Sequence, residues 1–132
     1  MNNFSINKRE DLIFPEMTFT IVGLAFEVFN CFGSGQRELI YHNALQKQFE
    51  LNKISFQSEV YHPVIFKGAT IGKNYFDFLI DKKIVVELKR SDYFSKSHFE
   101  QVNHYLRISN YKLGLLISFT TNGVRFKRVL NI

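Results

Sequence analysis

The chain has 132 residues, of which 45% are hydrophobic, so it is long enough for one packed core and too short for two ordinary domains. Seventeen Lys and Arg against twelve Asp and Glu leave a net charge of +5, which favours polyanionic partners such as nucleic acid. One cysteine excludes an intramolecular disulfide, and the lack of an apolar signal core or of an apolar run near the ~20 residues that cross a bilayer predicts a cytoplasmic protein without a membrane span.

A long, mostly apolar helix is predicted near the N-terminus. Residues 1–14 are polar and are expected to form a frayed leader of a single domain that spans residues 1–132. Pro15 suits the first position of a helix, which then runs to Phe32. Its polar residues fall on one narrow strip, so the helix is buried on most sides or supplies a homodimer face.

A second helix is predicted over Gln36–Leu51, after the Gly33–Gly35 break. It places Glu38, Tyr41 and Leu45 on one face. An unpaired carboxylate is costly to desolvate, so Glu38 is expected to have a partner there. The alternative is a first-turn position, where a negative charge is favourable.

The middle of the chain switches to a pattern typical of strands. Short strands are predicted at Ile54–Val60, Val64–Phe66 and Thr70–Ile71. Two further runs, Tyr75–Ile80 and Ile84–Lys89, flank a three-residue loop and predict a hairpin.

The register of this hairpin brings acidic residues together. Centring it on Lys82 pairs Leu79 with Val85 and Asp77 with Glu87, and the two-residue period of a strand adds Lys89 to the same face. Opposed like charges destabilise a strand pair unless a cation binds, and two carboxylates with waters suit Mg²⁺ or Mn²⁺. The alternative is a solvated polar face, and a one-residue slip would separate the carboxylates.

The last third of the chain predicts a helix between two strands. The helix covers Ser97–Ser109, with a capping box between its first residue and Glu100 and a left-handed stop at Asn110. Lys112–Phe119 is nearly all apolar, as a doubly covered strand would be, and Val124–Leu130 alternates as a more exposed strand. The β-α-β unit implies a parallel pair, so we expect an α/β fold with a mixed central sheet flanked by helices.

The histidines show no pattern of a metal site. His42, His62 and His104 have no metal-ligand spacing with the cysteine, which argues against zinc. His98 lies three residues before Gln101 on one helical face, although its place near the helix start is a simpler explanation.

The order of these signals resembles the GxxExxY protein family, a branch of the PD-(D/E)XK nuclease superfamily, from about Met17 to Leu130. The closing segments GLLISF and FKRVLN match as well. The residues that carry the resemblance are Gly35, Glu38 and Tyr41 in GQRELIY, Asp77 in YFDFLI, Glu87 and Lys89 in VVELKR, and Gln101 and Tyr105 in EQVNHYL.

The resemblance implies a restriction-endonuclease-like core and a set of site residues. Asp77, Glu87 and Glu38 are expected to be metal ligands, with Glu38 as the additional acidic residue from the helix. Lys89 is expected to be the group that activates water or neutralises phosphate. Gln101 completes the expected catalytic set, and the candidate substrate-binding residues are Tyr41, Arg90 and Tyr105. For Tyr105 the alternative is a core ring with its hydroxyl satisfied.

Two functions are compatible with these features. The first is a Mg²⁺- or Mn²⁺-dependent nuclease that hydrolyses phosphodiester bonds of DNA, or of RNA, by a metal-activated water. The second is a catalytically weak or inactive module of the same fold that binds nucleic acid or a protein partner. A homodimer through the first helix fits either one.

Overall fold

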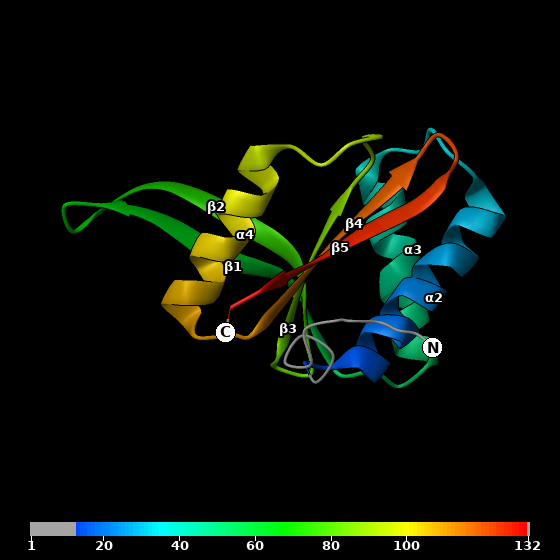
Figure 1. Cartoon of the computed structure of the whole chain (residues 1–132), viewed down its shortest axis with the longest axis horizontal. Helices are drawn as coiled ribbons and strands as arrows, with labels where there is room; N and C mark the ends of the chain where they lie inside the picture. Colours follow the sequence, from blue (N-terminus) through cyan, green and yellow to red (C-terminus); the bar gives the residue numbers. More distant parts are fainter. Residues whose placement is uncertain (1–12, 132) are drawn as a thin grey trace, which may run out of the picture.

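The computed structural model describes residues 13–131, so residues 1–12 of the expected leader lie outside the described part. The elements in chain order are α2 (Pro15–Phe32), α3 (Glu38–Leu51), β1 (Phe56–Phe66), β2 (Ala69–Ile80), β3 (Ile84–Lys89), α4 (Lys96–Ser109), β4 (Leu113–Thr120) and β5 (Gly123–Leu130). The strands form one mixed sheet in the order β1-β2-β3-β4-β5, in which β3 and β4 are parallel. Helices α2 and α3 lie on one face of this sheet and α4 on the other (Figure 1).

The first face of the sheet is covered by α2 and α3. Helix α2 has the predicted bounds, with proline in its first turn, and buries Ile21, Ala25 and Val28 against the strands. Ile13 and Phe14, which we assigned to the leader, also pack against this cluster. The predicted polar strip is exposed, and no helix within residues 13–131 is long and apolar enough to span a membrane.

The second face is covered by α4, which lies close to β4. A Cβ atom at Gly114 would stand 2.5 Å from Val102 Cγ1, so the missing side chain permits this approach. All eight residues of β4 are buried, as predicted for a strand covered on both sides. The β3-α4-β4 unit is therefore the fixed centre of the fold.

The start of α4 differs from the prediction. The N-cap is Ser95, whose hydroxyl accepts from the His98 backbone N–H at 3.2 Å, while the Ser95 N–H donates to His98 Nδ1 at 3.2 Å. Phe94 and Phe99 flank this cap with ring centroids 6.0 Å apart, in the positions of a hydrophobic staple. The predicted cap at Ser97 was wrong because His98 and this staple start the helix earlier.

The strands of the first hairpin are longer than predicted. We expected short strands, but β1 has 11 residues and β2 has 12. Lys67 and Gly68 both have positive φ, 49° and 80°, so a tight two-residue turn lets both strands run up to it. Pro63 is accommodated because β1 is an edge strand.

Candidate functional site

The site begins where the ladder between β2 and β3 ends. The predicted register is confirmed, since Leu79 pairs with Val85. The ladder ends toward the site with the pair of Phe78 and Val86. Beyond that pair a backbone N–H of each strand donates to a carboxylate side chain of the other strand. The Asp77 N–H donates to Glu87 Oε1 at 3.2 Å, and the Leu88 N–H donates to Asp77 Oδ2 at 2.8 Å. The two carboxylates therefore lie side by side.

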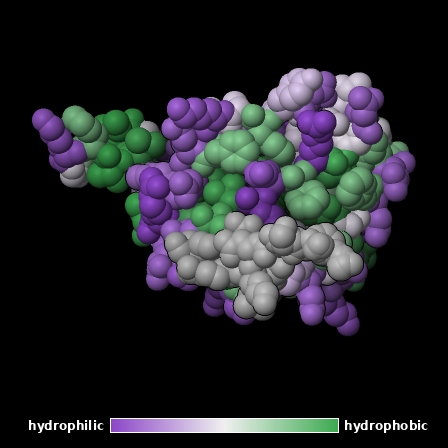
Figure 2. All heavy atoms as spheres, in the orientation of Figure 1, coloured by the Kyte–Doolittle hydropathy of each residue, from purple (hydrophilic) through white to green (hydrophobic). Residues whose placement is uncertain are grey.

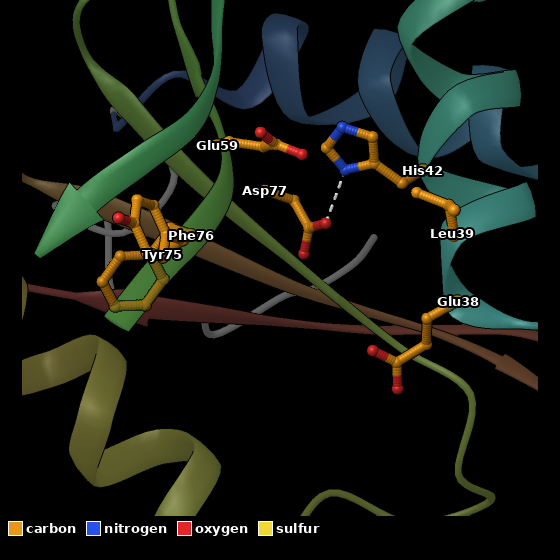
Figure 3. A pocket seen from close by; sticks show the side chains of 7 residues that line it. All are labelled: Glu38, Leu39, His42, Glu59, Tyr75, Phe76 and Asp77. Carbon is orange, nitrogen blue, oxygen red and sulfur yellow. Dashed lines mark hydrogen bonds and ion pairs between the residues drawn. The ribbon is translucent and has the colours of Figure 1, made fainter. Parts of the chain in front are cut away.

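Strand β2 is irregular at Asp77. In a regular strand Phe76 and Phe78 would cover the same face, yet Phe78 packs with α2 and α3 whereas Phe76 packs with α4. On β1 the neighbouring Glu59 has a positive φ of 55°, and the pairing passes from Ser58 to Val60 without it. This change of face directs the Asp77 carboxylate into a cavity (Figure 3).

His42 holds Asp77 from the other side of this cavity. Its Nδ1 lies 2.6 Å from Asp77 Oδ1 (Figure 3). Its Nε2 lies 3.0 Å from the Ser58 hydroxyl. The ring stacks on Phe78 with centroids 4.4 Å apart. We missed this residue in the sequence, although it lies one helical turn after Glu38, the spacing that puts both on one side of α3.

The two carboxylates have opposite pKa shifts. Burial, followed by the hydrogen bond and charge of Asp77, raises the pKa of Glu87 to about 9. Burial would also raise the pKa of Asp77, but hydrogen bonds with His42, Glu87 and the Leu88 N–H hold it below its usual value. Lys89 Nζ, 3.5 Å from Glu87 Oε2, offsets only part of the repulsion. At neutral pH the pair thus carries one negative charge and one proton.

The charge state of Asp77 and Glu87 bears on whether a divalent cation fits between them. A buried pair of carboxylates that cannot both ionise lacks positive charge, which a cation supplies. No group of three or more His, Cys, Asp and Glu side chains is arranged to hold a metal within residues 13–131. Mg²⁺, however, is commonly held by one or two carboxylates together with waters and substrate phosphates. Asp77 and Glu87 therefore fit such an ion without a third protein ligand.

Glu38 lies at the rim of the same cavity. The cavity has a volume of about 400 Å³ and is lined by Glu38, Leu39, His42, Glu59, Tyr75, Phe76 and Asp77. The sequence predicts a partner for Glu38 because its carboxylate shares an apolar face, but α3 begins at this residue and its side chain is exposed, so no desolvation cost calls for one. Its place in the first turn agrees with the alternative role beside the helix N-terminus.

The predicted substrate-binding tyrosines lie in the core. Tyr41 is fully buried and stacks on Phe119 at 4.1 Å, and its hydroxyl donates to the Gly33 carbonyl at 2.6 Å. Tyr105 is 7% exposed and packs against Phe76, with ring centroids 4.7 Å apart. Neither ring lines the cavity, so both support the elements around it.

The remaining predicted residues lie around the end of β3. Arg90 is exposed and donates from Nη1 to the Gln36 carbonyl at 3.1 Å, which ties β3 to the loop before α3. Gln101 is half-buried on α4, away from the cavity lining. The pKa of His98 is lowered by burial and by the charge of Lys89, which places the start of α4 near the site.

A mixed sheet flanked by helices, with two carboxylates and a lysine where β2 and β3 part, defines the restriction-endonuclease-like class of folds. A model of the PD-(D/E)XK nuclease superfamily matches residues 15–129, and the chain belongs to this superfamily. The narrower assignment to the GxxExxY family stays a prediction.

The comparisons with individual proteins support the fold alone. The chain is similar to the solved structure titled "Crystal structure of SSO0001", with a TM-score of 0.51 and 18% sequence identity. The match covers 93% of this chain and 60% of that one, so the chain spans about three fifths of the length of that structure. No curated protein matches.

Proposed function

We propose that the protein is a cytoplasmic nuclease that depends on Mg²⁺ or Mn²⁺ and hydrolyses phosphodiester bonds, with DNA as the first substrate to test and RNA as the second. The observation that carries the proposal is the contact of Asp77 with Glu87, 3.2 Å from backbone nitrogen to carboxylate, with Lys89 on the other Glu87 oxygen. The net charge of +5 supports a polyanionic substrate.

Asp77 and Glu87 are the residues that would hold the ion. When bound, the ion supplies Lewis-acid stabilisation of phosphate charge and lowers the pKa of a water molecule. His42 fixes the orientation of the Asp77 carboxylate and is itself fixed by Ser58 and Phe78. We therefore regard His42 as a positioning residue.

Lys89 is the group that faces the developing phosphate charge in this proposal. Its ammonium lies 3.5 Å from Glu87 Oε2 and is only partly exposed, so it stays close to the carboxylates. A fixed positive charge at such a place stabilises the transition state of phosphoryl transfer. Glu38 at the cavity rim, with Gln101 and Arg90 farther out, would contact the substrate or its bound water.

Cleavage of labelled DNA and RNA tests the proposal. Duplex, single-stranded and branched substrates are incubated with the protein and Mg²⁺, Mn²⁺ or a chelator. The expected result is metal-dependent cleavage that Asp77→Asn and Lys89→Ala abolish, while Lys89→Ala still binds the ion. Asp81→Asn and Lys83→Ala are matched controls, since both residues lie exposed in the loop at the far end of the same hairpin. Cleavage by Lys89→Ala at the wild-type rate would refute the role of Lys89.

One observation favours the second candidate function, a nucleic-acid-binding or protein-binding module without useful turnover. Both Asp77 oxygens already have partners, one in His42 and one in the Leu88 N–H. Salt-dependent binding of nucleic acid without cleavage in either metal ion would favour this candidate.

A homodimer through α2 is the expected assembly. Phe19 is 82% exposed, and together with Phe26 and Phe126 it lines an apolar cavity of about 380 Å³ between α2 and β5. Apolar surface of this kind is typical of a protein interface. Light scattering at two concentrations should show a dimer that Phe19→Glu converts to a monomer, and a monomer at both concentrations would contradict the assembly.

A further inference from the structure

The β1–β2 hairpin projects from the body of the fold and carries exposed rings. Tyr61 and Tyr75 are directly paired across the two strands, with ring centroids 5.5 Å apart, and are 46% and 55% exposed. Figure 1 shows the hairpin extending past α4, and Figure 2 shows hydrophobic side chains gathered on the projecting part. Rings that project from a narrow hairpin bury little against the protein itself, so their faces are available to a partner.

The same hairpin is free of acidic residues beyond the site. Between Val60 and Phe76 the sequence contains no Asp or Glu, but it contains Lys67 and Lys73. Both lysines are exposed, and Lys73 lies two residues from Tyr75 on β2, which places it on the same face. The Lys67 ammonium lies 5.4 Å from the ring of Phe66 at the hairpin end. Positive charge and exposed aromatic rings therefore share this surface.

The surface is continuous with the candidate site. Tyr75 lines the cavity into which Asp77 points, and Tyr61 stands beside Tyr75 on the next strand (Figure 3 labels Tyr75 and Asp77). A polymer held at Asp77 would thus continue over Tyr75 toward Tyr61 and Lys73. Tyr75 links the two regions directly, since it belongs to both.

We propose that this surface binds unpaired bases of a nucleic-acid strand, with Tyr61 and Tyr75 as stacking rings and Lys67 and Lys73 as phosphate contacts. The inference rests on the proposed function, because it extends the substrate path of the same site. Exposed aromatic rings interleaved with lysines are the usual means of binding single strands, since every base offers a face to a ring. In a duplex the bases stack on one another, so the rings favour single-stranded or partly unpaired substrates.

Binding measured without metal ions tests this inference separately from cleavage. Fluorescence anisotropy with a labelled deoxythymidine oligonucleotide and with a blunt duplex is recorded in chelator for wild-type protein, Tyr61→Leu, Tyr75→Leu and the matching Phe variants. Each Leu variant is expected to bind the single strand about tenfold more weakly than wild type. Each Phe variant is expected to bind it with the same affinity as wild type. Circular dichroism confirms that each variant is folded.

The lysines are tested against lysines outside the hairpin. The double variant Lys67→Gln with Lys73→Gln should lower both the affinity and its salt dependence, because two phosphate contacts are lost. The double variant Lys47→Gln with Lys112→Gln has the same net charge and changes residues on α3 and just before β4, so it should bind as wild type.

Several outcomes would overturn the inference. These are wild-type binding by the Leu variants, an equal loss on single strand and duplex, or hairpin-dependent binding to phosphatidylglycerol vesicles in place of the oligonucleotide. Hairpin-dependent binding without cleavage in Mg²⁺ or Mn²⁺ would instead leave the inference standing and remove the nuclease function. Cleavage that needs Asp77 but not the two tyrosines would leave the nuclease function standing and overturn the inference.

Discussion

The two hairpins of this protein share strand β2 but differ in the exposure of their functional side chains. In the β2–β3 hairpin Glu87 is buried and Asp77 is half-buried, and the two carboxyl groups together hold one proton in place of a second negative charge. In the β1–β2 hairpin the rings of Tyr61 and Tyr75 are exposed. In the proposed function a cation binds at the buried end of β2, and the bases of a nucleic-acid strand stack on the exposed end.

The largest expected effect is on the cleavage rate, and it distinguishes the acidic pair from the exposed loop of the same hairpin. Asp77→Asn should lower the cleavage rate by about a hundredfold or more, because metal binding and charge stabilisation are each worth several kcal/mol. Asp81→Asn, in the loop, should cleave as wild type. Initial rates at saturating Mn²⁺ measure both, and equal rates for the two variants would contradict the assignment of Asp77.

A smaller loss of metal affinity or activity is expected when His42, which orients Asp77, is replaced. His42→Leu keeps much of the bulk that packs on Phe78 but removes the 2.6 Å contact to Asp77 Oδ1. Loss of such an orienting partner typically costs about ten- to a hundredfold in metal affinity or activity. A metal titration of cleavage should therefore show a higher half-saturating concentration in His42→Leu, and an unchanged value would remove the positioning role.

The proton on Glu87 gives a pH dependence of stability with a definite sign. The pKa of Glu87 is about 9 in the folded protein against 4.5 as its ordinary value, so between these limits the folded state binds the extra proton. In chelator the free energy of unfolding should consequently fall as the pH rises from about 5 to 8.5. Glu87→Gln should flatten this slope and be more stable than wild type at the upper end of the range, because it has no proton to lose. Urea unfolding at several pH values checks it, and a wild-type slope in Glu87→Gln would contradict the cause.

The smallest effect compares a tyrosine of the core, Tyr41 on α3, with Tyr75 on the exposed hairpin. Tyr41→Phe removes a buried hydroxyl that donates to Gly33 O and accepts from Gln36 N, so it should cost about 1–2 kcal/mol. Tyr75→Phe, on the exposed hairpin, should change stability by less than about 0.5 kcal/mol. Chemical denaturation of both variants measures the difference. Equal costs would mean that the hairpin is packed more tightly than its exposure indicates.

The buried half of the site could be predicted from the sequence because its pattern is strong. The loop Asp81-Lys82-Lys83 fixes the register of Leu79 with Val85, and that register brings Asp77 to Glu87. The irregularity at Asp77 could not be predicted, since Phe76 and Phe78 follow the ordinary alternation in sequence and separate only when they pack into different clusters.

The residues around the site were harder to predict from the sequence, because their roles depend on packing. Tyr41 has the helical spacing of a site residue relative to Glu38, but the close approach of Phe119 makes it a core ring. His42 shows no local signal of its role, because it has no metal-ligand spacing with the cysteine and its partner Asp77 is 35 residues away in the sequence. The exposed hairpin was predicted as short strands because a surface pair lacks the apolar alternation on which such a prediction depends.

The central claim is that Asp77 and Glu87 share one cation. Calorimetry of metal binding tests this claim most directly. Mn²⁺ is titrated into the protein near pH 7.5 in two buffers of different ionisation enthalpy, which reports the protons released. The account predicts that about one proton leaves for each ion bound, because Glu87 must ionise, and that Glu87→Gln releases none. Binding without proton release, or binding unchanged in Asp77→Asn, would contradict it.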